Sequence, residues 1–168
     1  MYAELRKLSI DDGEDIYNML QCIEKDENSF TNPVKDMGYD DYKLWLIQQD
    51  DWSRGINLEK GYVPQTIYWL YVDDKPVGIG KIRHSLTDSS REFGGNVGYA
   101  ISNKHRGNGY GTILLKKLFE QCVKLNVKEV LLSVEKYNYA SKTVIEKCGG
   151  KLVRENQKGW FYKVEEMS

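Results

Sequence analysis

The residues best suited to chemistry in this chain are three alternating glycines that stand directly before an amphipathic segment. Gly107, Gly109 and Gly111 lie in the run 105–111 (HRGNGYG), and the apolar-patterned segment 112–119 follows. Glycine lets the backbone approach a ligand closely and adopt positive φ. The first amides of a helix lack internal partners and lie at its positive end. The run therefore predicts an anion site, suited to phosphate or pyrophosphate, at a helix N-terminus.

The spacing of this run excludes the two commonest phosphate-binding motifs. A P-loop needs Lys followed by Ser or Thr after its last glycine, whereas Thr112 follows Gly111 directly here, without a lysine. A dinucleotide-binding fingerprint needs two residues between its second and third glycines, whereas Tyr110 alone stands there. The pattern that remains is Arg-x-x-Gly-x-Gly, which begins at Arg106 and places its glycines at Gly109 and Gly111.

A second informative segment follows the amphipathic helix. The run 129–134 is rich in leucine and β-branched residues and predicts a buried parallel strand. Asn138 can cap a following helix by accepting a hydrogen bond from an amide two or three residues further on. The apolar positions of 144–148 have helical spacing, and Gly149 and Gly150 predict the end of that helix.

The glycine loop, together with the strand, asparagine and short helix that follow it, resembles the GNAT superfamily of acyl-CoA-dependent N-acyltransferases. The resemblance implies that the loop holds the pyrophosphate of coenzyme A. It also implies that Asn138, Ser141 and the backbone of Ile101 line the pantetheine arm. The cofactor-binding residues expected on this basis are Ile101, Arg106, Gly107, Asn108, Gly109, Tyr110, Gly111, Thr112, Asn138 and Ser141. An ordinary N-cap is an equally simple role for Asn138, and a solvent-facing position is one for Ser141.

The resemblance extends over nearly the whole chain. Three short features, Arg83-His84, Gly94-Gly95 and the segment 144–147 (VIEK), are similar to those of a poorly characterised group of predicted acetyltransferases within the superfamily. The resemblance to that group does not indicate a substrate.

Amine acylation by a thioester needs a base, and the resemblance leaves its identity open. Several family members use a glutamate on or near the strand before the loop, but the segment 96–102 contains none. The candidates are His84, whose ordinary pKa suits the task, Glu135 at the end of the second strand, and Glu92 in a loop. Each of the three is equally readable as a solvated or structural side chain. Gly98 permits a bulge in 96–102 that would aim a backbone amide at the thioester carbonyl.

The leaving thiolate needs a proton or a hydrogen bond, and here the chain departs from the family. Many relatives place a tyrosine seven residues after the asparagine, where this chain has Ile145. Tyr137 and Tyr139 flank Asn138 and are the substitutes, with Tyr137 the preferred catalytic candidate. Unassisted departure is the alternative, because a thiol pKa of about 8.5 makes a fair leaving group.

The acceptor pocket is expected between the two N-terminal helices and the strand end near Arg83. Aromatic side chains and carboxylates in 30–62 could receive a cationic amine, whereas Arg83 could bind an acceptor carboxylate. The two ideas imply opposite substrates. A buried aromatic core with a solvated acidic face explains the same residues.

The elements that must position these groups alternate between strand and helix patterns. Strands are expected at 4–8, 66–72, 77–83, 96–102, 129–134, 151–155 and 160–164, and helices at 16–23, 39–50, 112–119 and 139–148. Loops are expected at 24–38, 51–65 and 85–95. The order predicts an α/β (α+β mixed) domain over residues 1–168. Its central, mostly antiparallel sheet should have about six to seven strands with a parallel pair at the CoA site, and helices on both faces.

Composition narrows the class of protein. The chain has 168 residues and a net charge of −1, so nothing suggests a nucleic-acid or anionic-membrane surface. It shows no membrane-spanning run and no signal peptide. Cys22, Cys122 and Cys148 fall on apolar helix faces and are expected to be buried and reduced, which suits the cytoplasm. With two histidines and no metal-type cysteine spacing, no metal site is expected.

These features together predict an acetyl-CoA-dependent N-acetyltransferase. It would act on the primary amine of an unidentified small-molecule or protein acceptor, by direct attack in a ternary complex. A CoA-binding sensor or regulatory module with little or no catalysis is the alternative, and a different phosphate-bearing ligand such as a nucleotide is a third. A homodimer is expected only by analogy with the family.

Overall fold

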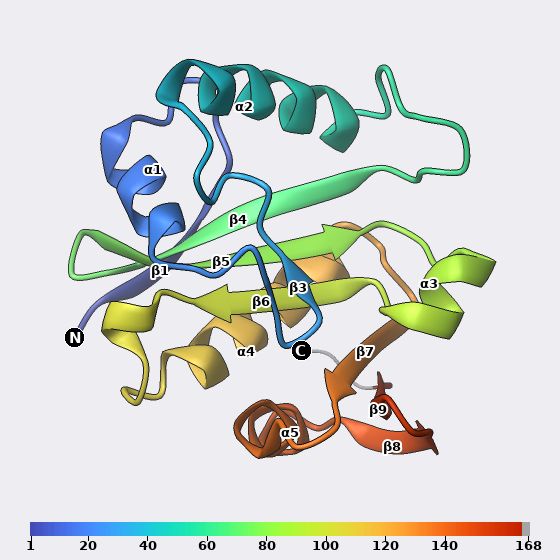
Figure 1. Ribbon diagram of the computed structural model, residues 1–168. Helices are drawn as coiled ribbons and strands as arrows, with labels where there is room; N and C mark the ends of the chain where they lie inside the picture. The colour runs from blue at the N-terminus through green and yellow to red at the C-terminus, as the bar shows by residue number, and fades with distance from the viewer. Residues whose placement is uncertain (166–168) are drawn as a thin grey trace.

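The computed structural model describes residues 1–165 and contains two antiparallel sheets with helices around them (Figure 1). The larger sheet has the order β1 (Ala3–Lys7), β4 (Gln65–Val72), β5 (Lys75–Arg83), β6 (Val97–Ile101). The smaller sheet has the order β7 (Val130–Glu135), β9 (Gly159–Val164), β8 (Lys151–Glu155), and β2 (Asp26–Glu27) pairs with β3 (Phe30–Thr31) as a hairpin. The helices are α1 (Glu14–Gln21), α2 (Tyr39–Ser53), α3 (Asp88–Phe93), α4 (Tyr110–Lys124) and α5 (Tyr139–Lys147), with a 3₁₀ turn, η1 (Asn103–His105).

Strand β4 shows why helices cover both faces of the larger sheet. Its side chains alternate between two hydrophobic cores, since successive residues of a strand point to opposite faces. Trp69 and Tyr71 pack with α1 and α2, whereas Tyr68 and Leu70 pack with α4. Figure 1 shows α1 and α2 on one side of this sheet and α4 on the other.

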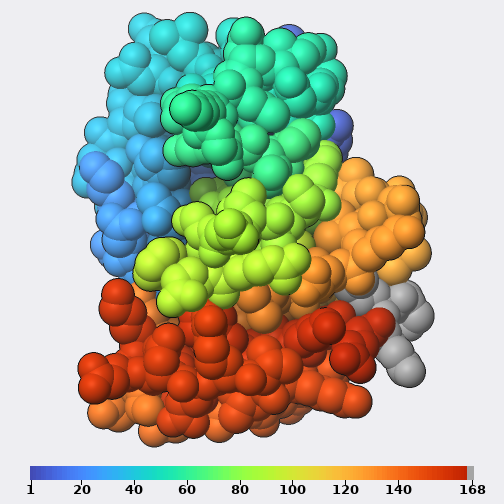
Figure 2. Space-filling model, turned by 90° about the vertical axis from the view of Figure 1, so that its right-hand side faces the viewer, coloured from blue at the N-terminus to red at the C-terminus, as the bar shows by residue number. Residues whose placement is uncertain are grey.

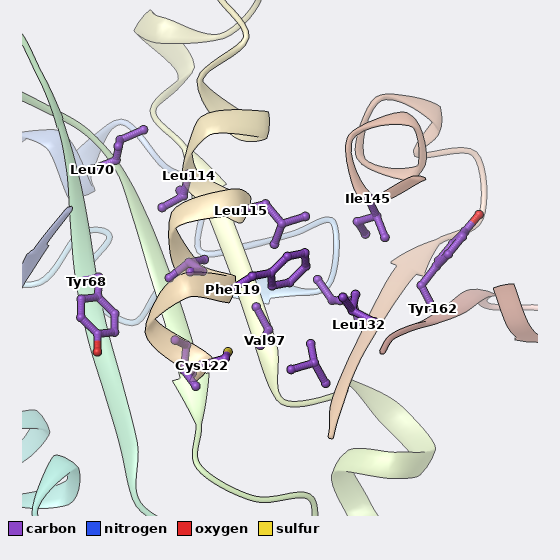
Figure 3. Packing of buried hydrophobic residues seen from close by; sticks show 14 of the residues in the cluster. Tyr68, Leu70, Val97, Leu114, Leu115, Phe119, Cys122, Leu132, Ile145 and Tyr162 are labelled. Carbon is purple, nitrogen blue, oxygen red and sulfur yellow. The ribbon is translucent and has the colours of Figure 1, made fainter. Parts of the chain in front are cut away.

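Helix α4 is seated closely on β5, and this fixes the glycine loop at the helix N-terminus. A Cβ added at Gly80 would lie 2.6 Å from Leu118 Cδ2, so only glycine allows this approach. Leu114, Leu115 and Phe119 fill the space between the two sheets (Figure 3). The buried face of α4 therefore holds the start of the helix at the gap between β6 and β7.

The two sheets meet at one end of β6 and β7 and separate beyond it. An isolated bridge joins Gly95 to Leu132, and the buried Asn96 side chain donates to Glu129 O at 2.8 Å and accepts from Leu131 N at 2.9 Å. Every strand ladder within residues 1–165 is antiparallel. Two antiparallel sheets thus stand where a single mixed sheet was expected. The expected parallel pair is not confirmed, because within residues 1–165 β6 and β7 are joined near their starts, at Gly95 and Asn96, and a gap separates them beyond.

Two segments expected as loops contain regular structure. The segment 85–95 includes α3, whose start is closed by a capping box between Thr87 and Ser90. The segment 24–38 includes the β2–β3 hairpin, with Asn28 and Ser29 in the left-handed region at its turn. Thr-x-x-Ser is a weak form of the usual capping signal, which explains why α3 was missed.

The cysteines are only in part as expected. All three are free, and Cys122 is buried. Cys22 and Cys148 are only half-buried, because each is the C-cap residue of its helix rather than part of the apolar face. Within residues 1–165 no helix is both long and apolar enough to cross a membrane.

Candidate active site

Three adjoining cavities follow the gap between β6 and β7. The loop cavity, about 350 Å³, is lined by the glycine loop 105–112, the end of β6 and the start of α5. The hairpin cavity, about 660 Å³, is lined by the end of β7, the β8–β9 turn, α3 and Ser29. A small junction, about 30 Å³, shares Asn28, Tyr99 and Ser141 with the loop cavity and Ser29 and Ser133 with the hairpin cavity. The three form one cleft with two different ends.

The loop cavity presents unpaired backbone amides. Gly107 and Gly109 have φ of 82° and 78°, which only glycine adopts readily. Gly109 is the N-cap of α4, and no described side chain caps this helix. The amides at Tyr110, Gly111 and Thr112 are therefore open at the positive end of a fifteen-residue helix. This geometry suits a phosphate or pyrophosphate.

Arg106 braces the loop instead of extending into open solvent. Its Nε donates to Ile101 O at 3.2 Å, and its Nη1 lies 2.8 Å from Glu27 Oε1 on β2. Asn108 is likewise tied within the loop, donating to His105 O at 2.9 Å. The guanidinium lines the loop cavity while paired with a carboxylate of the β2–β3 hairpin.

His105 also lines the loop cavity and was not among the expected site residues. Its Nδ1 is buried and has no hydrogen-bond partner among the described residues. A buried polar atom without a partner is costly, so a ligand atom in this cavity would relieve it. His105 could have been predicted as a site residue from the sequence, because it directly precedes Arg106 in the motif.

The free edge of β6 supplies further backbone groups. Ser102 N donates to Val77 O, and Arg83 N donates to Asn96 O. The backbone N–H and C=O groups of the even-numbered residues of β6 therefore point toward β5. Because pairing alternates along an antiparallel strand, the backbone groups of Tyr99 and Ile101 point toward the gap. The register between β5 and β6 is continuous, so the bulge expected at Gly98 is absent. The gap opens through the separation from β7 instead.

Asn138 and Ser141 lie together at the start of α5. The Asn138 side chain accepts from Ser141 N at 3.3 Å, which confirms the N-cap that the sequence predicted. Both residues line the loop cavity. The Ser141 hydroxyl does not face open solvent, because it is hydrogen-bonded to the Tyr99 hydroxyl at 2.9 Å.

Tyr99 is the functional candidate that sequence reasoning missed. Its side chain lies in the wall that the loop cavity and the junction share. Burial raises the pKa of the Tyr99 phenol to about 12, against a smaller opposing effect of the Ser141 hydrogen bond. The phenol therefore stays protonated and can donate a hydrogen bond at the junction. The contact that reveals it, between Tyr99 and Ser141, joins residues 42 positions apart, and no local sequence pattern contains it.

The position where many relatives have a tyrosine is apolar here. Ile145 is buried and points from α5 into the core beside Leu132 (Figure 3). Tyr137 has 76% of its surface exposed and lines none of the three cavities. Tyr139 packs on Trp160, with ring centroids 5.8 Å apart. Tyr137 and Tyr139 are thus not brought to the junction.

The candidate bases are separated by the fold. Glu135 lines the hairpin cavity, where its carboxylate accepts from Ser29 N at 3.0 Å. Glu92 lines the same cavity from α3. His84 lines none of the three cavities, and its Nε2 is hydrogen-bonded to Thr66 Oγ1 at 2.7 Å. Burial, and to a lesser degree the charge of Lys7, lowers the pKa of His84.

The expected acceptor pocket among the N-terminal aromatics is occupied by packing. Tyr42 and Trp45 are buried in the core beneath α1 and α2. Arg83 lines a separate cavity with Tyr62 and donates to Gly95 O at 3.2 Å. Within residues 1–165 no group of three or more His, Cys, Asp or Glu side chains is close enough to hold a metal ion.

Comparison with known proteins shows the family and the fold of the chain. Residues 3–151 match the family model described as an acetyltransferase (GNAT) domain. No curated protein matches the chain. Three similar solved structures are the ribosomal-protein α-N-acetyltransferase RimL in complex with coenzyme A, the Campylobacter jejuni N-acetyltransferase PseH in complex with acetyl coenzyme A, and a chimera of the Vibrio cholerae spermidine N-acetyltransferase SpeG with hSSAT.

All three are distant relatives that share the whole fold. RimL is 11% identical with a TM-score of 0.72, covering 99% of this chain and 96% of its own. PseH is 12% identical with a TM-score of 0.61, covering 98% and 99%. The SpeG chimera is 15% identical with a TM-score of 0.60, covering 97% and 93%. At these identities the likeness concerns the fold alone.

Proposed function

We propose that this chain, which belongs to the GNAT acetyltransferase family, transfers the acetyl group of acetyl-CoA to a primary amine. The observation that carries the proposal is the continuity of the cleft. An anion site of open helix amides lies at one end, and a carboxylate, Glu135, lies at the other. Residues shared through the junction connect the two ends. Residues 1–168 would form one domain, and the enzyme would act in the cytoplasm.

The loop cavity is the proposed site of the CoA moiety. The amides of Gly109 to Thr112 would hold the pyrophosphate, and the open edge of β6 at Tyr99 and Ile101 would receive the pantetheine arm. Asn138 and Ser141 line the same cavity from the start of α5. This arrangement would bring the thioester to the junction, within reach of the hairpin cavity.

The hairpin cavity is the proposed site of the amine. Glu135 would take a proton from the ammonium form of the acceptor, directly or through water. The free amine nitrogen would then attack the thioester carbonyl carbon, forming the C–N bond. The C–S bond breaks with its electron pair going to sulfur. In this scheme the nitrogen of the adduct loses its second proton to water as the amide forms. The Tyr99 hydroxyl donates a hydrogen bond to the departing thiolate, which takes up a proton from water and leaves as the thiol of CoA.

A CoA-binding regulator remains a second candidate because of the β2–β3 hairpin. Two of its contacts engage the cleft: Glu27 forms an ion pair with Arg106, and Ser29 N donates a hydrogen bond to the Glu135 carboxylate. A protein that binds acetyl-CoA and reports it through this hairpin would need no base. Homodimer formation stays a prediction by analogy.

Thermal unfolding of the purified protein with acetyl-CoA, ATP or NAD tests the proposed ligand. A ligand at about 100 times its Kd that binds only the folded state adds about 2.7 kcal/mol of stability. We expect an upward shift in Tm with acetyl-CoA alone. Absence of any shift at millimolar acetyl-CoA would reject both candidates, whereas a shift without turnover of any amine would favour the regulator.

A further inference from the structure

The charged side chains that line the hairpin cavity divide into paired and unpaired groups. Lys136 Nζ lies 3.0 Å from Glu155 Oε1, and Glu92 Oε2 lies 3.7 Å from Arg154 Nη1. Glu135 and Lys158 have no ion-pair partner within residues 1–165. The cavity therefore keeps one carboxylate and one ammonium group available for a ligand.

Glu135, an exposed residue at the end of β7, lies close to the residues that the hairpin cavity shares with the junction. The residue that donates to it, Ser29, lines both this cavity and the junction. Ser133, two residues before Glu135 on β7, also lines both. An ammonium group held at Glu135 would thus be next to the space where the thioester is proposed to lie.

Lys158 lines the same cavity from the turn between β8 and β9, directly before Gly159, the cross-strand partner of Glu135. The Asn156 side chain accepts from Lys158 N at 2.9 Å and from Gly159 N at 3.2 Å, so the turn is fixed by backbone contacts. The Lys158 ammonium lies 5.8 Å from the ring centroid of Phe93 on α3. Figure 2 shows the β8–β9 strands lying against α3 on one face of the molecule.

The two charges belong to the same end of one strand ladder. Glu135 is paired with Gly159, and Lys136 N donates to Lys158 O at 2.8 Å. The lining of the same cavity also includes two aromatic side chains, Phe161, which is buried, and Phe93, which has 67% of its surface exposed. A short ligand can therefore contact both charges across a hydrophobic surface.

We propose that the acceptor is an amine that carries an anionic group, a carboxylate or a phosphate, on the same molecule. This inference rests on the proposed function. Glu135 receives the amine and Lys158 receives the anion, while the intervening chain contacts Phe93 and Phe161. A diamine fits less well, because its second ammonium group would meet Lys158, with the Glu92 carboxylate already engaged by Arg154.

A matched series of acceptors tests the inference: aminopentanoate, aminopentyl phosphate, pentylamine and diaminopentane, with kcat/KM measured by thiol release at saturating acetyl-CoA. We expect the two anionic amines to exceed pentylamine, and diaminopentane to be the poorest. The ratio between the carboxylate and phosphate compounds identifies which anion is preferred. Equal or better use of diaminopentane would overturn the inference.

A charge reversal tests whether the preference for anionic amines is due to the Lys158 side chain. The variant is Lys158→Glu, and Lys128→Glu is its control. Both variants change the net charge equally, and Lys128 is exposed outside the cavities. We expect Lys158→Glu to lower kcat/KM for the anionic amines roughly fivefold and to raise it for diaminopentane, with Lys128→Glu unchanged.

Three outcomes separate the inference from the proposed function. Unaltered ratios of kcat/KM between the anionic amines and diaminopentane in Lys158→Glu would overturn the inference alone. Acetyl-CoA binding with acetylation of other amines, but of none of these four, would also overturn it alone. Failure of the wild-type protein to bind acetyl-CoA would instead remove the proposed function.

Discussion

The loop cavity and the hairpin cavity are built in opposite ways. The loop cavity depends on the contiguous run 105–112, and its binding groups are backbone amides positioned by glycines and a helix start. The hairpin cavity depends on side chains from four segments that are far apart in the sequence. A common ligand such as CoA can thus be held by a local motif, whereas selection of the acceptor resides in long-range side-chain contacts.

The largest effect should come from the base at the acceptor end. We expect Glu135→Gln to lower kcat by about 10²–10⁴-fold while acetyl-CoA affinity stays unchanged. Glutamine keeps an oxygen that can accept from Ser29 N, so the β2–β3 turn should stay in place. Steady-state thiol release measures the rate, and Glu92→Gln in the same cavity is the control. A similar fall in Glu92→Gln would show that the carboxylates act only through the charge of the cavity.

The next largest effect, on acetyl-CoA affinity, should come from Gly109, which shapes the backbone of the loop cavity. Gly109→Ala forces an L-residue to adopt φ of 78°, which costs about 1–2 kcal/mol and displaces the first amides of α4. Gly61→Ala is a matched control, since Gly61 has φ of 85° and, like Gly109, open space around its Cβ position, but lies outside the loop cavity. Calorimetric titration should show about tenfold weaker acetyl-CoA binding in Gly109→Ala alone. Equal weakening in both variants would trace the loss to general destabilisation.

These two ends also differ in how far the sequence predicted them. The glycine loop and the Asn138 cap follow from local spacing, because each is complete within a few residues. The contact between Ser29 and Glu135 joins residues 106 positions apart, and no local pattern contains it. The hairpin turn and α3 carry weak local signals, so the acceptor end was expected elsewhere, among aromatics that are buried in the core.

An effect of similar size, on turnover instead of affinity, is expected at the junction, where the two ends meet. Tyr99→Phe removes the hydroxyl but keeps the ring that lies 3.5 Å from the Cβ position of Gly111. We expect about tenfold slower turnover, the size of one lost hydrogen bond. Because burial raises the pKa of Tyr99 to about 12, the phenol is protonated throughout and the wild-type to variant ratio should be constant between about pH 6 and 9.

Tyr139→Phe is the control for that comparison, since Tyr139 is exposed and packs on Trp160 away from the junction. A wild-type to Tyr99→Phe ratio that varies with pH in this interval would mean that Tyr99 titrates as a base or acid at ordinary pH. Loss of acetyl-CoA affinity with an unchanged kcat would assign Tyr99 to binding only.

The smallest effect should come from the contact that ties the hairpin to the loop. Glu27→Gln breaks an ion pair whose side chains are 44% and 33% exposed, so the pair contributes little. Freed from Glu27, Arg106 can turn toward an anion, and acetyl-CoA should bind about two- to threefold more tightly. Titration calorimetry with Glu120→Gln as control measures this. Weaker binding would show that the hairpin supports the loop instead of competing for Arg106.

The central claim is that one cleft holds the donor at the glycine loop and the acceptor at Glu135. The most direct test measures acetyl-CoA Kd and amine turnover on the same preparations of Glu135→Gln and Gly109→Ala. We predict that Glu135→Gln loses turnover at unchanged Kd, and that Gly109→Ala loses affinity but recovers turnover at saturating acetyl-CoA. Loss of acetyl-CoA binding in Glu135→Gln, or undiminished turnover there, would contradict the account.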